Sequence, residues 1–228
     1  MALAIPSQAA PGADLNGTTT SKPTPATTSE SGSAAGAAAS PEPSPSPSPN
    51  VAIVPGYRPG VLGRTLEMHM DHYSRSHGFG PKFEGGLATG IGDLVKRLDR
   101  PVNEVWSAVI TVPQIQPRDG AVVVERIVGV VYVDGECSGQ EGVARLRCFI
   151  VDESARGLGV GRKLLDAAME FVREKGFREC QLSTLSSLTT ARSMYEKAGF
   201  KPVGEKWLDT FEKGTMSVDY AWRRPESV

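Results

Sequence analysis

Alternating hydrophobic and polar positions predict an α/β domain over residues 51–228. Apolar or aromatic side chains recur at intervals of four, three and four at Leu62, Leu66, His69 and Tyr73. This spacing places the four side chains on one side of an α-helix. We therefore predict a helix whose inward face is this stripe.

Residues 161–175 carry the clearest helical pattern in the chain. Five hydrophobic side chains fall on one side of the segment, namely Leu164, Leu165, Ala168, Phe171 and Val172. Charged side chains fall on the other side, as in an amphipathic helix. The phrases EKGF at 174–177 and EKAGF at 196–200 put a glycine where helices end in the left-handed conformation. Both this helix and a later one should therefore stop at these glycines.

A weaker helix is predicted over residues 83–98. This segment contains four glycines, Gly85, Gly86, Gly90 and Gly92. Each glycine costs a helix about 1 kcal/mol relative to alanine. We therefore expect this helix to be mobile or broken.

Runs of valine, isoleucine and aromatic residues predict the strands. They lie at residues 52–57, 104–112, 121–133, 144–151, 179–185, 202–208 and 215–222, with a turn or break near Arg126. The expected fold is a mixed α/β (α+β) one. It has a mostly antiparallel central sheet of about six or seven strands, flanked by about four helices.

Residues 1–50 differ in composition from the rest of the chain. They consist mainly of Ala, Ser, Thr, Pro and Gly, and they end in SPEPSPSPSPN. Such a segment cannot bury enough apolar surface to offset an ordering cost of roughly 1 to 2 kcal/mol per residue. We predict a disordered tail at 1–50 and one folded domain at 51–228. A proline-rich interaction segment stays open as an alternative role for the tail.

Charge and cysteine content exclude several function classes. The 228 residues carry 25 Lys and Arg against 26 Asp and Glu, which argues against binding to nucleic acid. No run reaches the roughly 20 apolar residues of a membrane span. Cys137, Cys148 and Cys180 lack CxxC spacing, and His69 and His72 have no third ligand at suitable spacing. We expect a cytoplasmic protein, which could also enter the nucleus, with no bound metal and no membrane partner.

The phrase FIVDESARGLGVGRKLL at 149–165 joins a strand, a glycine-rich turn and a helix. Glycines let backbone amides approach an anion closely, and the start of a helix adds unpaired N–H groups. A pyrophosphate is a fitting ligand for such a turn. The sequence matches neither a Walker A loop nor GxGxxG. A tight turn with an exposed arginine is the alternative.

Residues 149–200 resemble the core of the GNAT superfamily of N-acetyltransferases. Arg156, Gly159 and Gly161 match the family's phosphate-binding pattern, and residues 191–200 match its later tyrosine phrase. The resemblance implies acetyl-CoA as co-substrate and a gap between the fourth and fifth strands that admits its thioester. The implied cofactor-binding residues are Phe149, Ile150, Val151, Arg156, Gly157, Leu158, Gly159, Val160, Gly161 and Arg162.

The same resemblance implies that Tyr195 donates a proton to the departing thiolate. A buried aromatic without a catalytic role is the alternative interpretation of this residue. Many relatives have asparagine where this chain has Leu188. Thr189 or Thr190 could still cap the helix that follows.

Residues 57–84 and 145–152 resemble acetyltransferase domains that are often fused to MarR-type DNA-binding domains, and no such DNA-binding part is expected here. The acceptor-side positions that this resemblance implies are His69, Tyr73, Phe83, Arg147 and Thr184, with Glu84 as base. Arg145 and Arg147 share one strand face, so they could bind a carboxylate of the acceptor or form salt bridges.

These features predict an acyltransferase of the N-acetyltransferase type. It would move an acetyl group from acetyl-CoA to a primary amine of a small-molecule or peptide acceptor, by direct transfer in a ternary complex. A non-catalytic acyl-CoA sensor is the alternative. The protein is expected to be a monomer or a homodimer.

Overall fold

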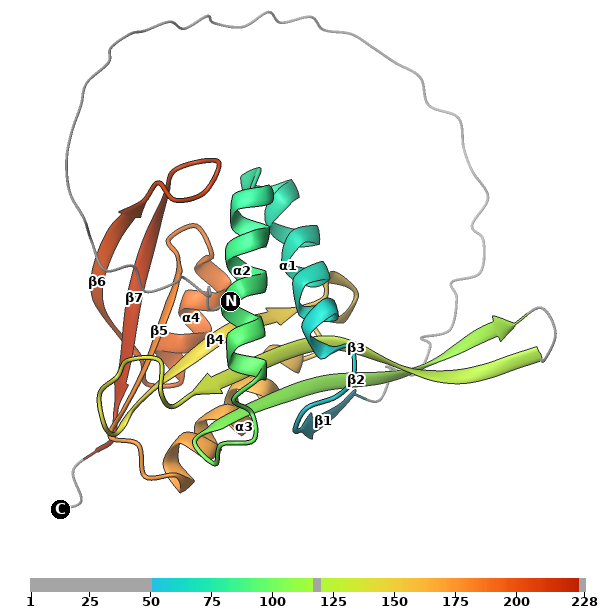
Figure 1. The fold of residues 1–228 in the computed structure, drawn as a ribbon, viewed down its shortest axis with the longest axis horizontal. Helices are drawn as coiled ribbons and strands as arrows, with labels where there is room; N and C mark the ends of the chain where they lie inside the picture. Colours follow the sequence, from blue (N-terminus) through green and yellow to red (C-terminus); the bar gives the residue numbers. More distant parts are fainter. Residues whose placement is uncertain (1–50, 117–119, 226–228) are drawn as a thin grey trace, which may run out of the picture. The chain divides into compact units, whose positions relative to one another are not determined.

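The computed structural model describes residues 51–116 and 120–225. The predicted tail at 1–50 lies outside these residues. Within them the chain forms a mixed α/β domain around one seven-stranded sheet (Figure 1). None of the helices in these residues is long and apolar enough to cross a bilayer.

The sheet has the strand order β1-β2-β3-β4-β5-β7-β6. The strands are β1 (Val51–Pro55), β2 (Asn103–Gln116), β3 (Gly120–Asp134), β4 (Val143–Val151), β5 (Glu179–Leu185), β6 (Lys201–Leu208) and β7 (Thr215–Arg223). Every neighbouring pair is antiparallel except β4 and β5, which are parallel. The predicted fold class is thus confirmed.

Within the described residues, four α-helices cover the two faces of the sheet. They are α1 (Val61–His77), α2 (Pro81–Val95), α3 (Val160–Glu174) and α4 (Thr189–Lys197). Buried side chains of α1 and α2 form one apolar cluster, and those of α3 and α4 form another. Because successive strand residues belong to different clusters, the two helix pairs lie on opposite faces of the sheet (Figure 1).

The inward face of α1 differs from the predicted stripe. The buried positions are Val61, Thr65, Met68, His69 and Tyr73, whereas Leu62 and Leu66 are only half-buried. Thr65 can be buried because its hydroxyl donates to the carbonyl of Val61 at 2.7 Å and lies 3.0 Å from the hydroxyl of Tyr132. His69 is held in the same way, since its Nδ1 donates to the carbonyl of Thr65 at 2.8 Å. Thr65 and Met68 thus take the inward positions expected for Leu62 and Leu66, whereas His69 and Tyr73 are buried as predicted.

Helix α2 is continuous over residues 81–95, so the predicted break was wrong, and so was the predicted end at Leu98. Phe83, Leu87, Ile91 and Leu94 are all buried on one side of it. Most helical stability in proteins comes from packing such a face rather than from propensity. Packing therefore outweighs the cost of the four glycines.

Strand β3 is also continuous, and no turn interrupts it near Arg126. Its pairing with β2 instead shifts by one residue, because Ala108 faces Gly129 while Val109 faces Ile127. Val128 is the extra residue of this β-bulge. A bulge lets a long, twisted ribbon keep its inward residues inward.

Both predicted helix ends are confirmed. Gly176 and Gly199 have φ angles of 77° and 93°, and the amide of Phe200 donates to the carbonyl of Tyr195 at 3.0 Å. The predicted threonine cap of α4 was wrong. Leu188 is the N-cap of this helix and no side chain caps it, because Leu188 packs into the apolar cluster of α1 and α2.

Candidate active site

Strands β4 and β5 separate shortly after they begin. They pair only where Val143–Arg145 lies beside Glu179–Gln181. Beyond this point β4 continues to Val151 and β5 to Leu185 without pairing to each other. The edge of β4 that faces β5 therefore offers unpaired backbone N–H and C=O groups, as the predicted gap requires.

A β-bulge in β4 lies beside this gap. Val130 faces Ile150 and Tyr132 faces Arg147, so Cys148 and Phe149 together oppose one residue of β3. Cys148 has a φ of 49°, which is the left-handed region and is unusual for a residue with a side chain. Such strained positions gather at functional sites. The bulge sends Cys148 into the cluster of α1 and α2 and Phe149 into the cluster of α3 and α4.

After β4 the chain forms the predicted glycine-rich turn. Gly157 and Gly159 have φ angles of 80° and 72°, and a Cβ at either position would meet open space. Gly159 is the N-cap of α3, and neither a capping side chain nor an acidic residue occupies the first turn. The first amides of α3 and the positive end of its dipole are thus available to an anion.

Asp152 fixes the start of this turn. Its carboxylate accepts from the amide of Ser154 at 2.9 Å and forms an ion pair with Arg64 of α1. Burial opposes the ionisation of Asp152, but the hydrogen bonds from Ser154 and the charge of Arg64 outweigh it, so the pKa of Asp152 is lowered. The carboxylate therefore stays ionised and ties the turn to α1.

A pocket of about 590 Å³ opens between the turn and the start of α4. Its lining contains eight of the predicted cofactor-binding residues, namely Phe149, Val151, Arg156, Gly157, Gly159, Val160, Gly161 and Arg162. Ile150 and Leu158 do not line it. Ile150 is buried on the side of α1 and α2, and the side chain of Leu158 is exposed.

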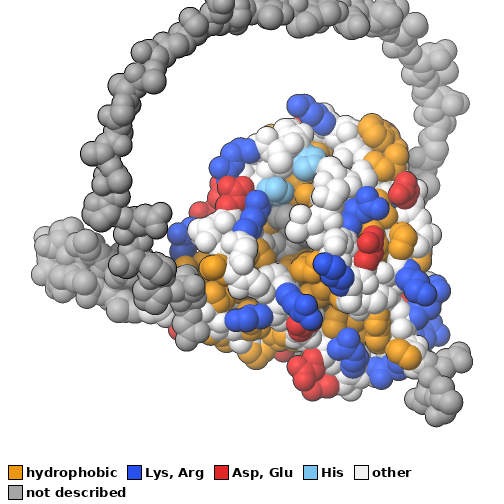
Figure 2. Space-filling view, turned by 180° about the vertical axis from the view of Figure 1, so that it is seen from behind, with side chains coloured by type: hydrophobic (Ala, Val, Ile, Leu, Met, Phe, Trp, Pro, Cys, Tyr) orange, Lys and Arg blue, Asp and Glu red, His pale blue; other side chains and the backbone are white. Residues whose placement is uncertain are grey.

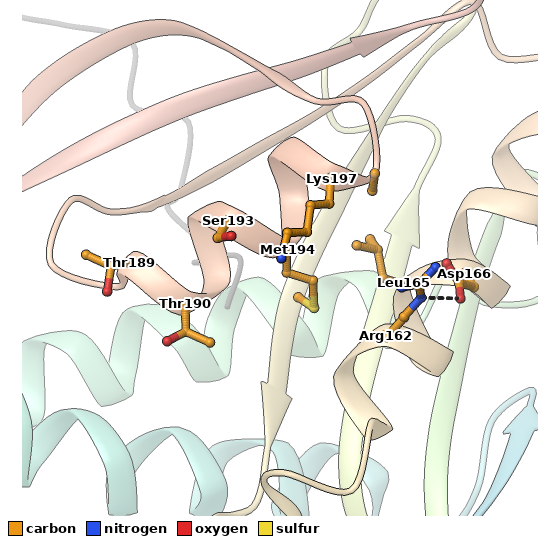
Figure 3. A pocket seen from close by; sticks show the side chains of 9 residues that line it. Arg162, Leu165, Asp166, Thr189, Thr190, Ser193, Met194 and Lys197 are labelled. Atoms are coloured by element: carbon orange, nitrogen blue, oxygen red, sulfur yellow. Dashed lines mark ion pairs between the residues drawn. The ribbon is translucent and has the colours of Figure 1, made fainter.

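A second hollow of about 750 Å³ continues between α3 and α4 (Figure 3). It shares Arg162, Thr189, Thr190 and Met194 with the pocket at the turn. Ser193 and Lys197 of α4 add a hydroxyl and a cation. The sequence did not point to these α4 residues, because their role depends on α4 lying beside α3.

Tyr195 lies behind Phe149, which lines the pocket at the turn. The Tyr195 ring is 6.1 Å from that of Phe149 and 6.0 Å from that of Phe200. Its side chain is fully buried, and its hydroxyl has no hydrogen-bond partner among the described residues. Burial raises the pKa of Tyr195 well above its usual value, so the phenol stays protonated and can donate.

His72 lines the same pocket from α1, which the sequence did not predict. Arg156 donates from Nη2 to Nδ1 of His72 at 3.2 Å. Burial and the charge of Arg156 lower the pKa of His72 to about 4. Figure 2 shows histidine side chains at the surface next to lysine and arginine side chains. No local sequence signal could have revealed this contact, since the two residues are 84 positions apart.

The acceptor-side residues predicted by resemblance fall into two groups. His69, Tyr73, Phe83 and Thr184 are buried, the first three of them on α1 and α2. Glu84 is exposed in the first turn of α2 and lines none of the hollows described above.

Arg147 is nearly buried, and its Nη1 is 3.0 Å from the carboxylate of Asp134. Arg97 binds the same carboxylate at 3.0 Å, so Asp134 lies between two guanidinium groups. Arg145 instead donates to the hydroxyl of Ser183. Of the two interpretations left open by the sequence, the structure shows an ion pair for Arg147.

Three comparisons with known proteins agree with this geometry. Residues 117–202 match the family model described as the acetyltransferase (GNAT) domain. A mycothiol acetyltransferase of Geodermatophilus obscurus is 31% identical over 86 residues, which are 38% of this chain and 24% of that protein. The uncharacterized N-acetyltransferase YjgM of Escherichia coli is 36% identical over 84 residues, 32% of this chain and 50% of that protein. The chain thus spans at most half the length of these relatives.

Solved structures share the fold. A ribosomal-protein-alanine N-acetyltransferase from Brucella melitensis has a TM-score of 0.56 at 16% identity, covering 76% of this chain and 99% of that one. A putative acetyltransferase from Acinetobacter baylyi has a TM-score of 0.59 at 11% identity, covering 78% and 94%. The narrower resemblance to MarR-fused domains stays a prediction. Residues 117–202 thus match the acetyltransferase (GNAT) domain, and the described residues share the fold of these solved structures.

Proposed function

We propose that this chain is an acetyl-CoA-dependent N-acetyltransferase that acts by direct transfer in a ternary complex. The observation that carries the proposal is the pocket that begins at the amides of α3 and reaches Phe149 at the β4 bulge. Tyr195, with its unpaired hydroxyl, lies directly behind Phe149. The names of the relatives, which are acetyltransferases, support the same activity.

The residues present fit acetyl-CoA along its length. The amides from Gly157 to Gly161 suit its pyrophosphate, because open space lies where a Cβ would be at Gly157 and Gly159. The hydroxyls and the lysine of α4 suit its nucleotide end. The unpaired edge of β4 at residues 149–151 suits the amides of its pantetheine arm, as an added strand would. When bound, acetyl-CoA supplies a thioester carbonyl that an amine can attack.

Backbone amides of β4 and the hydroxyl of Tyr195 would then assist the transfer of the acetyl group. Unpaired backbone amides of β4 hydrogen-bond the carbonyl oxygen as negative charge builds on it. As the carbon–nitrogen bond forms and the carbon–sulfur bond breaks, Tyr195 gives its proton to the sulfur. The proton that the amine releases restores the phenol, so the proton count balances. Burial raises the pKa of Tyr195, which keeps the phenol protonated and available as a hydrogen-bond donor to the sulfur.

The acceptor is proposed to be a primary amine that approaches from the side of α1 and α2. At pH 7 such an amine must lose a proton, at a cost of about 4 to 5 kcal/mol for a lysine-like pKa. The residues proposed to line the acceptor side are the ones that the sequence resemblance implied, namely His69, Tyr73, Phe83, Arg147 and Thr184. Glu84 as base stays a prediction, and its exposure gives it no added support.

The test has two stages. Calorimetry first measures binding of CoA, and thiol release from acetyl-CoA is then followed with pools of amino acids, polyamines, aminoglycosides and peptides. Gly159→Glu should abolish binding, whereas Tyr195→Phe should bind CoA and lose most turnover. A wild-type chain that does not bind CoA would contradict the proposal. Binding without release in any pool would favour a non-catalytic sensor.

A further inference from the structure

Tyr73 of α1 lies between two histidines that contact segments on both sides of the opening between β4 and β5. Its neighbour His72 accepts from Arg156 of the glycine-rich turn at 3.2 Å. His77, one turn further along the helix, has its Nε2 3.0 Å from the hydroxyl of Ser187 in the β5–α4 connection. The Tyr73 ring lies 4.9 Å from that of His72 and 5.5 Å from that of His77. Contacts to both sides of the opening therefore fix the position of Tyr73.

Tyr73 and Tyr195 approach this opening from opposite faces of the sheet. Tyr73 belongs to the apolar cluster of α1 and α2, together with the bulge residue Cys148. Tyr195 belongs to the cluster of α3 and α4, together with the next bulge residue, Phe149. Beyond Arg145, no β4–β5 pairing closes the sheet between the two clusters.

The two hydroxyls share an unusual state. Both are buried, and neither has a hydrogen-bond partner among the described residues. Burial raises the pKa of both phenols. The negative charge of an ionised Tyr73 would raise the pKa of Tyr195 further, as expected for neighbouring groups. A buried, unpaired hydroxyl destabilises a folded chain. Two of them at one opening indicate that a ligand supplies the missing acceptor.

We propose that Tyr73 is a second hydrogen-bond donor to the sulfur of the acyl donor, from the face opposite to Tyr195. The inference rests on the proposed function. A thiolate is an acceptor only and can take hydrogen bonds from both phenols at once. The carbonyl oxygen has the β4 amides as donors, whereas the tyrosines are left for the sulfur. Both phenols stay protonated throughout the working pH range, so each keeps its hydrogen for donation.

The test measures the pKa of the CoA thiol in its complex, from thiolate absorbance in the ultraviolet as pH is varied. It needs no acceptor. Two donors should lower this pKa below that of free CoA. Tyr73→Phe and Tyr195→Phe should each raise the thiol pKa in the complex by about 0.5 to 1, as expected when one of two hydrogen bonds to a charged group is lost.

Tyr132→Phe is the matched control. This tyrosine is also buried on the side of α1 and α2, but its hydroxyl lies 3.0 Å from that of Thr65. Its variant should leave the thiol pKa unchanged and lower the midpoint of thermal unfolding. Tyr73→Phe should not lower the midpoint without ligand, because it removes an unpaired hydroxyl.

The outcomes separate the two proposals. A wild-type chain that fails to bind CoA contradicts the proposed function. If the wild-type protein binds CoA but does not shift the pKa of its thiol, the proposed role of Tyr73 is contradicted. The proposed function is not affected by that result. The same holds if Tyr73→Phe behaves like Tyr132→Phe in both measurements.

Discussion

Nη2 of Arg156 lies 3.2 Å from Nδ1 of His72, which joins the glycine-rich turn to α1. An arginine can only donate, so Nδ1 must accept and the neutral ring carries its hydrogen on Nε2. Nε2 is itself buried and has no partner among the described residues. The turn proposed to hold the pyrophosphate is therefore in direct contact with the helix that carries Tyr73.

Replacing Arg156 should change the titration of His72. The pKa of His72 is lowered to about 4, first by burial and then by the charge of Arg156. Arg156→Gln removes the charge but not the burial, so the pKa should rise and still stay below 6.5. Ring-proton shifts in NMR spectra would follow this titration. Arg126→Gln is the control, and equal titration in both variants would contradict the assigned cause.

His69 should make stability depend on pH. Burial lowers its pKa from 6.5 to about 4, so the unfolded chain binds the proton more tightly than the folded chain does. The free energy of unfolding should therefore fall as pH drops from 6.5 to 4, by up to about 3 kcal/mol from this residue. Urea unfolding across this range measures the slope. His69→Gln should flatten it, and an equally steep slope in that variant would rule out His69 as the source.

Local patterns predicted the second half of the domain well. Gly176 and Gly199 end their helices as expected, because a left-handed helix end needs only nearby residues. Strand β5 has the predicted bounds for a similar reason, since short strands with clear edges leave little choice of register. The first half was predicted less well. There, Thr65 is buried by hydrogen bonds that no hydrophobic pattern reveals.

The site was predictable where it depends on backbone conformation and not where it depends on distant contacts. Gly157 and Gly159 mark the turn in the sequence because they take positive φ angles. The contact of Arg156 with His72 and the unpaired hydroxyl of Tyr73 depend on how α1 crosses β4. Neither residue type nor spacing carries that information.

Alanine at Gly159 should separate backbone strain from ligand binding. Gly159 and Gly176 have φ angles of 72° and 77°, and at both positions a Cβ would have no other atom within 4 Å. Both alanine variants should therefore lose about 1 kcal/mol of stability. Of the two glycines, only Gly159 lines the pocket, so only Gly159→Ala should also weaken CoA binding. The loss of one hydrogen bond to a phosphate should weaken binding by about tenfold or more. Equal CoA affinity in the two variants would argue against the turn as the phosphate site.

Glu212 should stabilise the start of α2. Its carboxylate accepts from the amides of Gly80 at 2.9 Å and Lys82 at 2.6 Å, whereas Gly80 provides no capping side chain of its own. Burial opposes its ionisation, but these amides outweigh it and lower the pKa of Glu212. The stabilisation should thus be present above pH 4.5 and be lost as pH falls through the lowered pKa. Glu212→Gln should lower the midpoint of thermal unfolding at pH 7, and this loss should shrink as the pH is lowered below 4.5. Glu205→Gln on exposed β6 is the control and should not change the midpoint.

Alanine substitution should affect stability differently at two glycines of α2. Gly85 is exposed, and a Cβ at this position would have nothing within 4 Å. Gly85→Ala should therefore raise the free energy of unfolding by about 0.5 to 1 kcal/mol, because alanine has less conformational freedom to lose on folding. A Cβ at Gly90 would instead lie 2.8 Å from Nη2 of Arg147, whose partner Asp134 is fully buried. Gly90→Ala must therefore displace this guanidinium, and its gain in helix propensity should be offset by the weakened ion pair. Urea unfolding of both variants measures the difference. An equal gain at both positions would mean that Arg147 moves aside freely and that Gly90 is not needed for its ion pair.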